Sequence, residues 1–223
     1  EQIEAFLKGI ASANPDRVTT TDIGKSYEGR SIWMVTIKSG TAPSERSVIV
    51  DAGIHAREWI APAVALYFID MLIKQPEIAE GVEFRIIPVV NPDGYVYSHT
   101  SNRLWRKNRR ITSNRRCRGV DLNRNWSYRW GEGGSSSDEC SEIYRGTSAF
   151  SEPETRTPGL GLYPTSGTSR DWAFATLGAN YSFTVELRDT GDNGFVLPSN
   201  QIKPTREENW EGFKYLIQIV KVT

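Results

Sequence analysis

Two side chains that could bind a metal ion, His55 and Glu58, lie three positions apart just after an apolar run. An imidazole and a carboxylate at this spacing can both reach one zinc ion. A catalytic zinc uses three protein ligands and one open position for water. The sequence has only one other histidine, His99. Each member of the pair also has a purely structural interpretation, a hydrogen-bonded histidine and a first-turn helix carboxylate.

The composition is that of an ordinary globular chain with room for a substantial core. It has 223 residues, of which 38% are hydrophobic and 24% are charged. Lys plus Arg and Asp plus Glu both number 27, so no overall field favours nucleic acid or an anionic membrane. Eight of the sixteen residues from Arg103 to Arg118 are basic, but apolar residues interrupt them. With no apolar stretch near the ~18–20 residues that span a bilayer, we expect neither nucleic acid nor membrane as a partner.

Strands alternate with helices along the sequence. We expect a first helix that ends near Asn14 and two further helices at 58–74 and 204–220. We expect strands at 31–38, 47–51, 82–90 and 181–187, and a turn at 91–94. This order predicts one α/β/α domain over 1–223, with a mixed, largely parallel twisted sheet covered by helices on both faces. His55 and Glu58 follow the strand 47–51, at the sheet edge where open α/β sheets place active sites.

One stretch contradicts its own local signals. Residues 151–154 read Ser-Glu-Pro-Glu, which is typical of a helix start with a capping box. Thr157-Pro158-Gly159 follows after barely one turn, where the helix should continue. The pattern predicts that a segment is missing between about residues 156 and 162.

The run from Gly53 to Trp59, Gly-Ile-His-Ala-Arg-Glu-Trp, resembles the zinc motif of the metallocarboxypeptidases of the pancreatic A/B type. Four more matches follow in the family's chain order: Asn-Pro-Asp-Gly-Tyr at 91–95, Arg-Leu-Trp-Arg-Lys at 103–107, Gly-Val-Asp-Leu-Asn-Arg-Asn-Trp at 119–126 and Phe-Thr-Val-Glu-Leu-Arg-Asp at 183–189. The resemblance extends from about Gly24 to the C-terminus, apart from the junction near 156–162. It implies an exopeptidase that hydrolyses the C-terminal bond of peptides and proteins.

The resemblance implies one Zn²⁺ per chain, with His55 and Glu58 as two of its three ligands. Glu186 matches the general base that takes a proton from the zinc-bound water, whose pKa zinc can bring near 7. Arg106 matches the arginine that stabilises the tetrahedral oxyanion. Without the resemblance, Arg106 reads as one more cation in a basic stretch.

Recognition of the substrate's C-terminal carboxylate is implied for Asn123 and Arg124, because a planar guanidinium can grip a carboxylate with two hydrogen bonds. Tyr163 matches the mobile tyrosine that closes over the substrate, and Arg57 matches an accessory arginine of the cleft.

The two cysteines, Cys117 and Cys140, could be reduced thiols of a cytosolic protein or one disulfide of a secreted one, which we favour. They occupy the positions of the family's disulfide. The resemblance implies a secreted monomer with peptide C-termini as substrate, and a pro-segment or a protein inhibitor as a possible partner.

The resemblance places Arg170 at the base of the pocket for the last side chain of the substrate. An arginine there resembles the acid-preferring members, such as carboxypeptidase O and insect gut glutamate carboxypeptidases. A buried guanidinium needs a carboxylate partner, which a C-terminal Glu or Asp would supply. The alternative is that Arg170 points to solvent and that the pocket has an A-type preference for apolar or aromatic residues.

The family's third zinc ligand is a histidine between the helix start at Ser151 and Tyr163, and this part is missing here. The chain also begins slightly inside the family's mature N-terminus. His99 matches a non-ligand stretch, so we expect it to be structural. Either the protein carries residues that this sequence omits, or it is a zinc-less relative that binds peptide C-termini without cutting them. We favour the omission, because loss of a central strand would leave backbone groups unpaired.

Overall fold

The computed structural model describes residues 1–38, 44, 46–156, 168–177 and 179–222. The elements follow the chain in this order: α1 (Gln2–Ala13), β1 (Val18–Lys25), β2 (Ser31–Ile37), β3 (Arg46–Asp51), α2 (Ile60–Lys74), η1 (Pro76–Ala79), β4 (Val82–Ile87), α3 (Pro92–Thr100), η2 (Leu122–Arg124), α4 (Ser169–Leu177), η3 (Ser199–Gln201) and α5 (Ile202–Val222).

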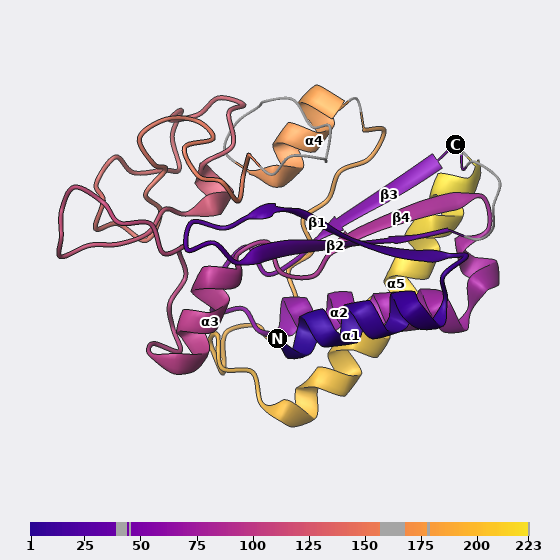
Figure 1. The fold of residues 1–223 in the computed structure, drawn as a ribbon. Helices are drawn as coiled ribbons and strands as arrows, with labels where there is room; N and C mark the ends of the chain where they lie inside the picture. Colours follow the sequence, from indigo (N-terminus) through magenta and orange to yellow (C-terminus); the bar gives the residue numbers. More distant parts are fainter. Residues whose placement is uncertain (39–43, 45, 157–167, 178, 223) are drawn as a thin grey trace.

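The described strands form one mixed sheet in the order β1-β2-β4-β3 (Figure 1). β1 pairs antiparallel with β2, β2 pairs antiparallel with β4, and β3 pairs parallel with β4. The predicted mixed α/β sheet is therefore confirmed, although only one of the three described strand pairs is parallel. β3 is an edge strand among the described residues.

The main core lies between one face of the sheet and three helices, α1, α2 and α5 (Figure 1). The helix α5 buries Trp210, Phe213 and Ile217, whose spacing places them on one helical face. They pack with Phe68 of α2 and Phe84 of β4, and the rings of Phe68 and Phe213 stack at 4.4 Å.

A smaller apolar cluster lies on the other face of the sheet, where Ile32 and Met34 of β2 meet Leu122. This face is covered by the long loop region between α3 and α4, drawn above the sheet in Figure 1, rather than by several helices. The disulfide between Cys117 and Cys140 fastens two parts of this region, with the Cα atoms 5.0 Å apart. The predicted disulfide is thus confirmed.

Most predicted elements are present, with small shifts of their ends. The turn predicted at 91–94 is wrong: the Asn91 side chain accepts a hydrogen bond from Gly94 N and caps α3, with Pro92 in the first turn. Strand β1 was not predicted, because Thr and Asp fill most of its exposed positions. Residues 151–156 make one turn, with Arg156 N donating to Glu152 O, and the residues directly after them lie outside the described chain.

The strand predicted at Tyr181–Leu187 is not formed among the described residues. This segment makes no backbone hydrogen bond to the described part of the sheet. Phe183 and Val185 are 61% and 60% exposed. A strand sequence without a neighbouring strand leaves its backbone groups and apolar side chains open to solvent.

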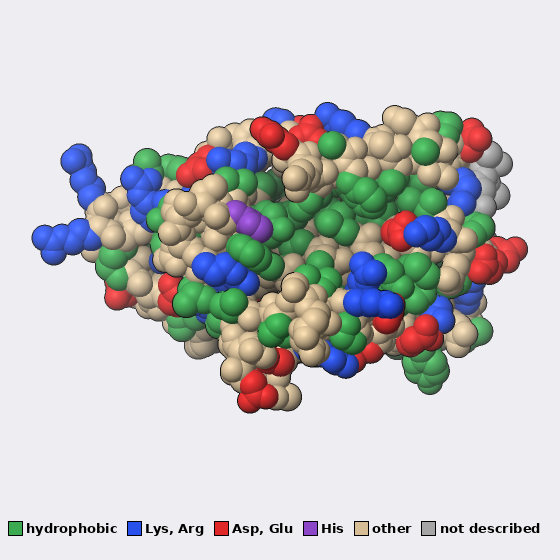
Figure 2. Space-filling model, turned by 90° about the horizontal axis from the view of Figure 1, so that it is seen from below, with side chains coloured by type: hydrophobic (Ala, Val, Ile, Leu, Met, Phe, Trp, Pro, Cys, Tyr) green, Lys and Arg blue, Asp and Glu red, His purple; other side chains and the backbone are tan. Residues whose placement is uncertain are grey.

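Hydrophobic side chains also gather over a broad area of the face seen from below (Figure 2). Among the described helices, none combines the length and apolarity required to cross a bilayer.

Candidate metal and substrate site

His55 and Glu58 lie in the loop that leads from β3 into α2, at the carboxyl end of the strand. His55 Nδ1 and Glu58 Oε1 are 2.9 Å apart, so the two predicted ligands face one another. The loop is tied to the basic segment through a hydrogen bond from Ala56 N to Arg106 O. His55 is 8% exposed.

Asp121 contacts the ring nitrogen of His55 that does not face Glu58. Its carboxylate is fully buried, with Oδ1 3.2 Å from His55 Nε2 and Oδ2 accepting hydrogen bonds from Nε and NH2 of Arg106 at 3.2 and 3.0 Å. Burial raises the pKa of Asp121, but His55 and Arg106 outweigh it and lower that pKa to about 2. Burial lowers the pKa of His55, and the hydrogen bonds with Asp121 and Glu58 more than offset this and raise it.

Asp121 lies within one of the five motifs, but its local sequence does not predict a role in the site. Its contact with His55 spans 66 positions, so no local spacing could reveal it. The available signal was an acidic residue between two apolar ones, Val120 and Leu122, in a segment that reads as buried.

The described residues fit part of a zinc site. His55 Nδ1 and Glu58 Oε1 converge, and the other ring nitrogen of His55 faces a buried carboxylate, as is usual for zinc-binding histidines. Within the described ranges, no group of three His, Cys, Asp or Glu side chains could hold a metal ion. A complete zinc site would therefore need a donor from outside these residues.

Two arginines, Arg106 and Arg57, lie near the two predicted metal ligands, His55 and Glu58. Arg106 NH1 lies 3.8 Å from Glu58 Oε1. Arg57 NH1 donates to Leu104 O and to Glu142 Oε2 at 3.3 and 3.1 Å. Burial, and then the charge of Arg106, lower the pKa of Arg57. The predicted accessory arginine and the predicted oxyanion arginine are thus close enough for their charges to interact.

Asn123 and Arg124 lie on η2, directly after Asp121. Asp121 Oδ1 accepts a hydrogen bond from Asn123 N, so the same carboxylate fixes the histidine and the start of this turn. Arg124 donates from Nε to Gly134 O and from NH1 to Asn123 O. The NH2 group of Arg124 has no hydrogen-bond partner in the described part of the chain.

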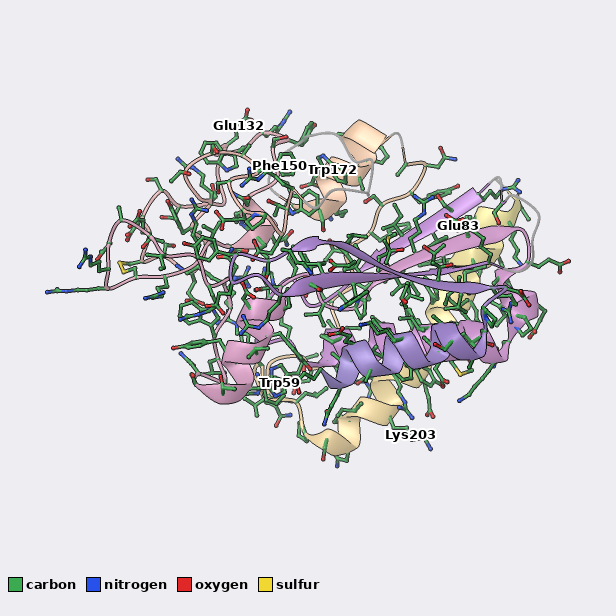
Figure 3. All side chains as sticks on the ribbon, in the orientation of Figure 1. Trp59, Glu83, Glu132, Phe150, Trp172 and Lys203 are labelled. Carbon is green, nitrogen blue, oxygen red and sulfur yellow. A yellow bond between two sulfur atoms is a disulfide. The ribbon has the colours of Figure 1, made fainter. Side chains whose placement is uncertain are left out.

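Helix α4 is anchored beside this turn. Ser169 N donates to Asn123 Oδ1 at 3.2 Å. The ring of Trp126 lies 4.9 Å from that of Trp172 on α4 and 5.8 Å from that of Phe150. Phe150 and Trp172 lie close together at the top of the molecule (Figure 3). Aromatic packing therefore places the first turn of α4 next to the predicted carboxylate-binding residues.

Arg170 lies in the first turn of α4, and its side chain is half exposed. Its Nε and NH2 donate to Oδ1 of the neighbouring Asp171 at 3.1 and 2.9 Å. An open hollow of about 240 Å³ is lined here by Tyr128, Arg170, Asp171, Phe174, Ala175 and Ser182. The charge of Arg170 is thus partnered within the chain and not buried.

One predicted residue is not brought to the site, and another cannot be placed. Tyr163 lies outside the described residues. Glu186 is exposed on the extended segment Tyr181–Leu187, and it makes no hydrogen bond or ion pair with the described residues of the site. His99 stacks on Trp59 with ring centres 3.7 Å apart, a structural contact away from the metal pair; Figure 3 shows Trp59 beside α3.

A buried carboxylate pair supports the turn that carries Asp121. Glu152 and Glu154 are 0% and 2% exposed. Asn108 Nδ2 donates to Glu152 Oε2 at 2.8 Å and to Glu154 Oε2 at 3.3 Å, while Asn108 Oδ1 accepts from Val120 N at 2.8 Å. Burial raises the pKa of Glu154 to about 7, and the charges of Glu152 and Asp93 add to the rise.

Gly119 makes the close approach of this turn possible, which gives a first prediction. Its φ is +84°, and a Cβ there would lie 2.3 Å from Asn108 O. We expect Gly119→Ala to lower the free energy of unfolding by about 2–4 kcal/mol, because alanine is strained at this φ and its Cβ would push the backbone away from Asn108. Urea unfolding measures it, and Gly9→Ala, at an open helical position, is the matched control. An unchanged Gly119→Ala protein would contradict the described geometry.

The sequence matches the family described as "Zinc carboxypeptidase" over residues 3–159 and 157–212. The chain belongs to the zinc carboxypeptidase family. It is 35% identical to carboxypeptidase B of Astacus astacus, with all of this chain and 96% of that protein aligned, and 33% identical to carboxypeptidase B of Bos taurus, with 99% and 70% aligned. The structure resembles bovine thrombin-activatable fibrinolysis inhibitor in complex with tick carboxypeptidase inhibitor, with a TM-score of 0.88, 30% identity and coverage of 98% and 95%.

The family match is divided near residue 157, and the aligned relative is longer than this chain. The family match consists of two pieces that meet at 157–159. The alignment with the Astacus astacus protein runs over 293 positions, 70 more than the 223 residues of this chain. The relatives therefore have residues with no counterpart here.

Proposed function

We propose that this chain is the catalytic domain of a secreted, monomeric zinc carboxypeptidase that removes single residues from the C-termini of peptides and proteins. The observation that carries the proposal is the cluster of His55, Glu58, Asp121 and Arg106, in which two metal donors converge in front of a buried carboxylate. The family membership and the disulfide support the same conclusion.

We propose further that the functional protein carries an additional segment at the junction near 157 and that this segment supplies the third zinc ligand. The two-piece family match and the 70 additional aligned positions support this. The outer edge of β3, which has no described strand beside it, and the segment Tyr181–Leu187, which pairs with no described strand, support it too. A strand with apolar side chains normally requires a neighbouring strand that pairs with its backbone.

Each residue then has a defined task. Zinc, when bound, polarises the scissile carbonyl and makes water a nucleophile near neutral pH. Arg106, held by Asp121 beside Glu58, donates hydrogen bonds to the oxygen that becomes negative as the carbonyl is attacked. Asn123 and the unpartnered NH2 group of Arg124 bind the C-terminal carboxylate, with Arg57 and Tyr163 along the cleft. Glu186 accepts the proton of the attacking water once its strand is in place.

The test measures zinc and activity together on the natural protein. We expect about one zinc per chain, release of C-terminal residues, and no attack on the same peptide with an amidated C-terminus. Removal of zinc by a chelator abolishes the activity, and added zinc restores it. The second candidate is a zinc-less binding protein, favoured by the absence of a third donor among the described residues. Peptide binding without metal would establish that candidate instead.

We propose a preference for C-terminal Glu or Asp through Arg170. Its position in the hollow beside Asn123 supports this. The Arg170 guanidinium now donates to Asp171. A substrate carboxylate would therefore have to replace Asp171 as its acceptor. The alternative, an A-type preference, follows if Arg170 keeps Asp171 and stays in solvent.

The Arg170→Asp variant decides between these preferences. We expect kcat/KM for a Glu-terminated peptide to fall roughly 10- to 100-fold, because a hydrogen bond to a charged group contributes about 1.5–3 kcal/mol. Hydrolysis of a Leu-terminated peptide should change much less. Arg129→Asp, at an exposed arginine outside the hollow, is the control. Wild-type protein that cuts Leu-terminated peptides faster than Glu-terminated ones would establish the A-type preference.

A further inference from the structure

We propose that Asn180 is a site of N-linked glycosylation, an inference that rests on the proposed secretion of the protein. The sequence contains two Asn-X-Ser acceptor patterns, at 125–127 and at 180–182, and neither has proline in the middle. Such patterns are modified in secreted proteins where the asparagine lies at the surface. The structure separates the two.

Asn125 is unsuited to modification. Its side chain is 0% exposed, and Nδ2, the atom that would carry the sugar, donates to Arg145 O, Ser148 O and Ser151 Oγ at 2.8–3.1 Å. Its Oδ1 accepts hydrogen bonds from Glu152 N and Thr155 Oγ1. A sugar on this nitrogen would displace the chain segments that Asn125 joins, so a folded protein with a glycan at Asn125 is excluded.

Asn180 has the opposite surroundings. It is exposed in the connection between α4 and the extended segment that begins at Tyr181. Its side chain has no hydrogen-bond partner among the described residues, and Ala179 N donates to Ala173 O just before it, which ends the helix. A glycan on Asn180 Nδ2 therefore extends into solvent without breaking a described contact.

Ser182 completes the acceptor pattern. In the folded protein its hydroxyl donates to Arg170 O at 2.8 Å. The transfer requires this hydroxyl to leave Arg170 O, which breaks one described hydrogen bond. The Asn180 amide nitrogen forms a bond to the first sugar of a lipid-pyrophosphate-linked oligosaccharide, the sugar–phosphate bond breaks, and the amide proton leaves with the pyrophosphate side.

The experiment secretes the protein from eukaryotic cells behind a cleavable signal peptide and compares its intact mass before and after treatment with peptide-N-glycosidase. We expect the wild-type mass to fall by one oligosaccharide, and peptide mapping to place the resulting aspartate at position 180. Asn180→Gln and Ser182→Ala should abolish the shift. Ser182→Thr should keep it, because threonine also completes the pattern.

The control is Asn200→Gln, an exposed asparagine outside any acceptor pattern, which should leave the shift unchanged. An unmodified secreted wild type, or a shift that persists in Asn180→Gln, would overturn the proposal. The mass readout needs neither zinc nor peptidase activity. A protein that is glycosylated but inactive would therefore refute the proposed function and leave this inference intact.

Discussion

Replacing Asp121 with alanine should lower the free energy of unfolding by about 3–5 kcal/mol, because it leaves Arg106 and His55 without their buried partner. Asp121 is fully buried, and it accepts two hydrogen bonds from Arg106 and one from Asn123 N in addition to its contact with His55. Removal of one member of a buried charged group costs far more than removal of an exposed ion pair. Urea unfolding at neutral pH measures the loss.

Asp70→Ala is the matched control, because Asp70 forms an ion pair with Lys74 one helical turn away at the surface. Such a pair contributes about 0–1 kcal/mol. The milder Asp121→Asn change keeps the shape of the side chain, and in the zinc-loaded protein it should weaken metal affinity about 10- to 100-fold. Equal, small effects of Asp121→Ala and Asp70→Ala would show that Asp121 does not organise the site.

Glu154 should make the protein more stable at mildly acidic pH than at pH 8. Its pKa is about 7 in the folded chain, against 4.5 for an ordinary glutamate. Between these values the folded chain keeps the proton and the unfolded chain releases it. The free energy of unfolding therefore falls as the pH rises from 4.5 to 7, by about 3 kcal/mol from this group, and the contribution is constant above that range.

The Glu154→Gln variant removes the titration and keeps the shape. Its amide nitrogen faces donors from Tyr27 N or Asn108 Nδ2, so a small constant loss of stability is expected. The informative quantity is the slope of the free energy of unfolding against pH, which should be flatter than in the wild type between pH 4.5 and 7. Glu207→Gln, at an exposed position of α5, should keep the wild-type slope. Parallel slopes in wild type and Glu154→Gln would contradict the raised pKa.

Local patterns predicted the elements that depend on local signals. The spacing of Trp210, Phe213 and Ile217 identified α5, and the apolar runs identified β2, β3 and β4. The signal at Asn91-Pro92 served equally for a turn and for a helix start, and the capping hydrogen bond to Gly94 decided for the helix. Sequence periodicity does not distinguish these two outcomes.

The site was predictable where it is local and unpredictable where it depends on folding. His55 and Glu58 lie three positions apart in one loop, and the structure brings them together. Asp121 and the pair Glu152 and Glu154 join the site through contacts tens of residues apart along the chain, which no spacing shows. Glu186 needs a neighbouring strand to be positioned, and the described residues contain none.

The measurement that tests the central claim most directly is the intact mass of the protein from its natural source, after removal of any N-linked glycan. The central claim is that the functional enzyme carries a further segment near residue 157, with the third zinc ligand in it. We predict a mass above the 25.1 kDa of these 223 residues by close to the mass of the 70 additional aligned positions. A mass of 25.1 kDa would contradict the account, because the zinc site would then lack its third ligand.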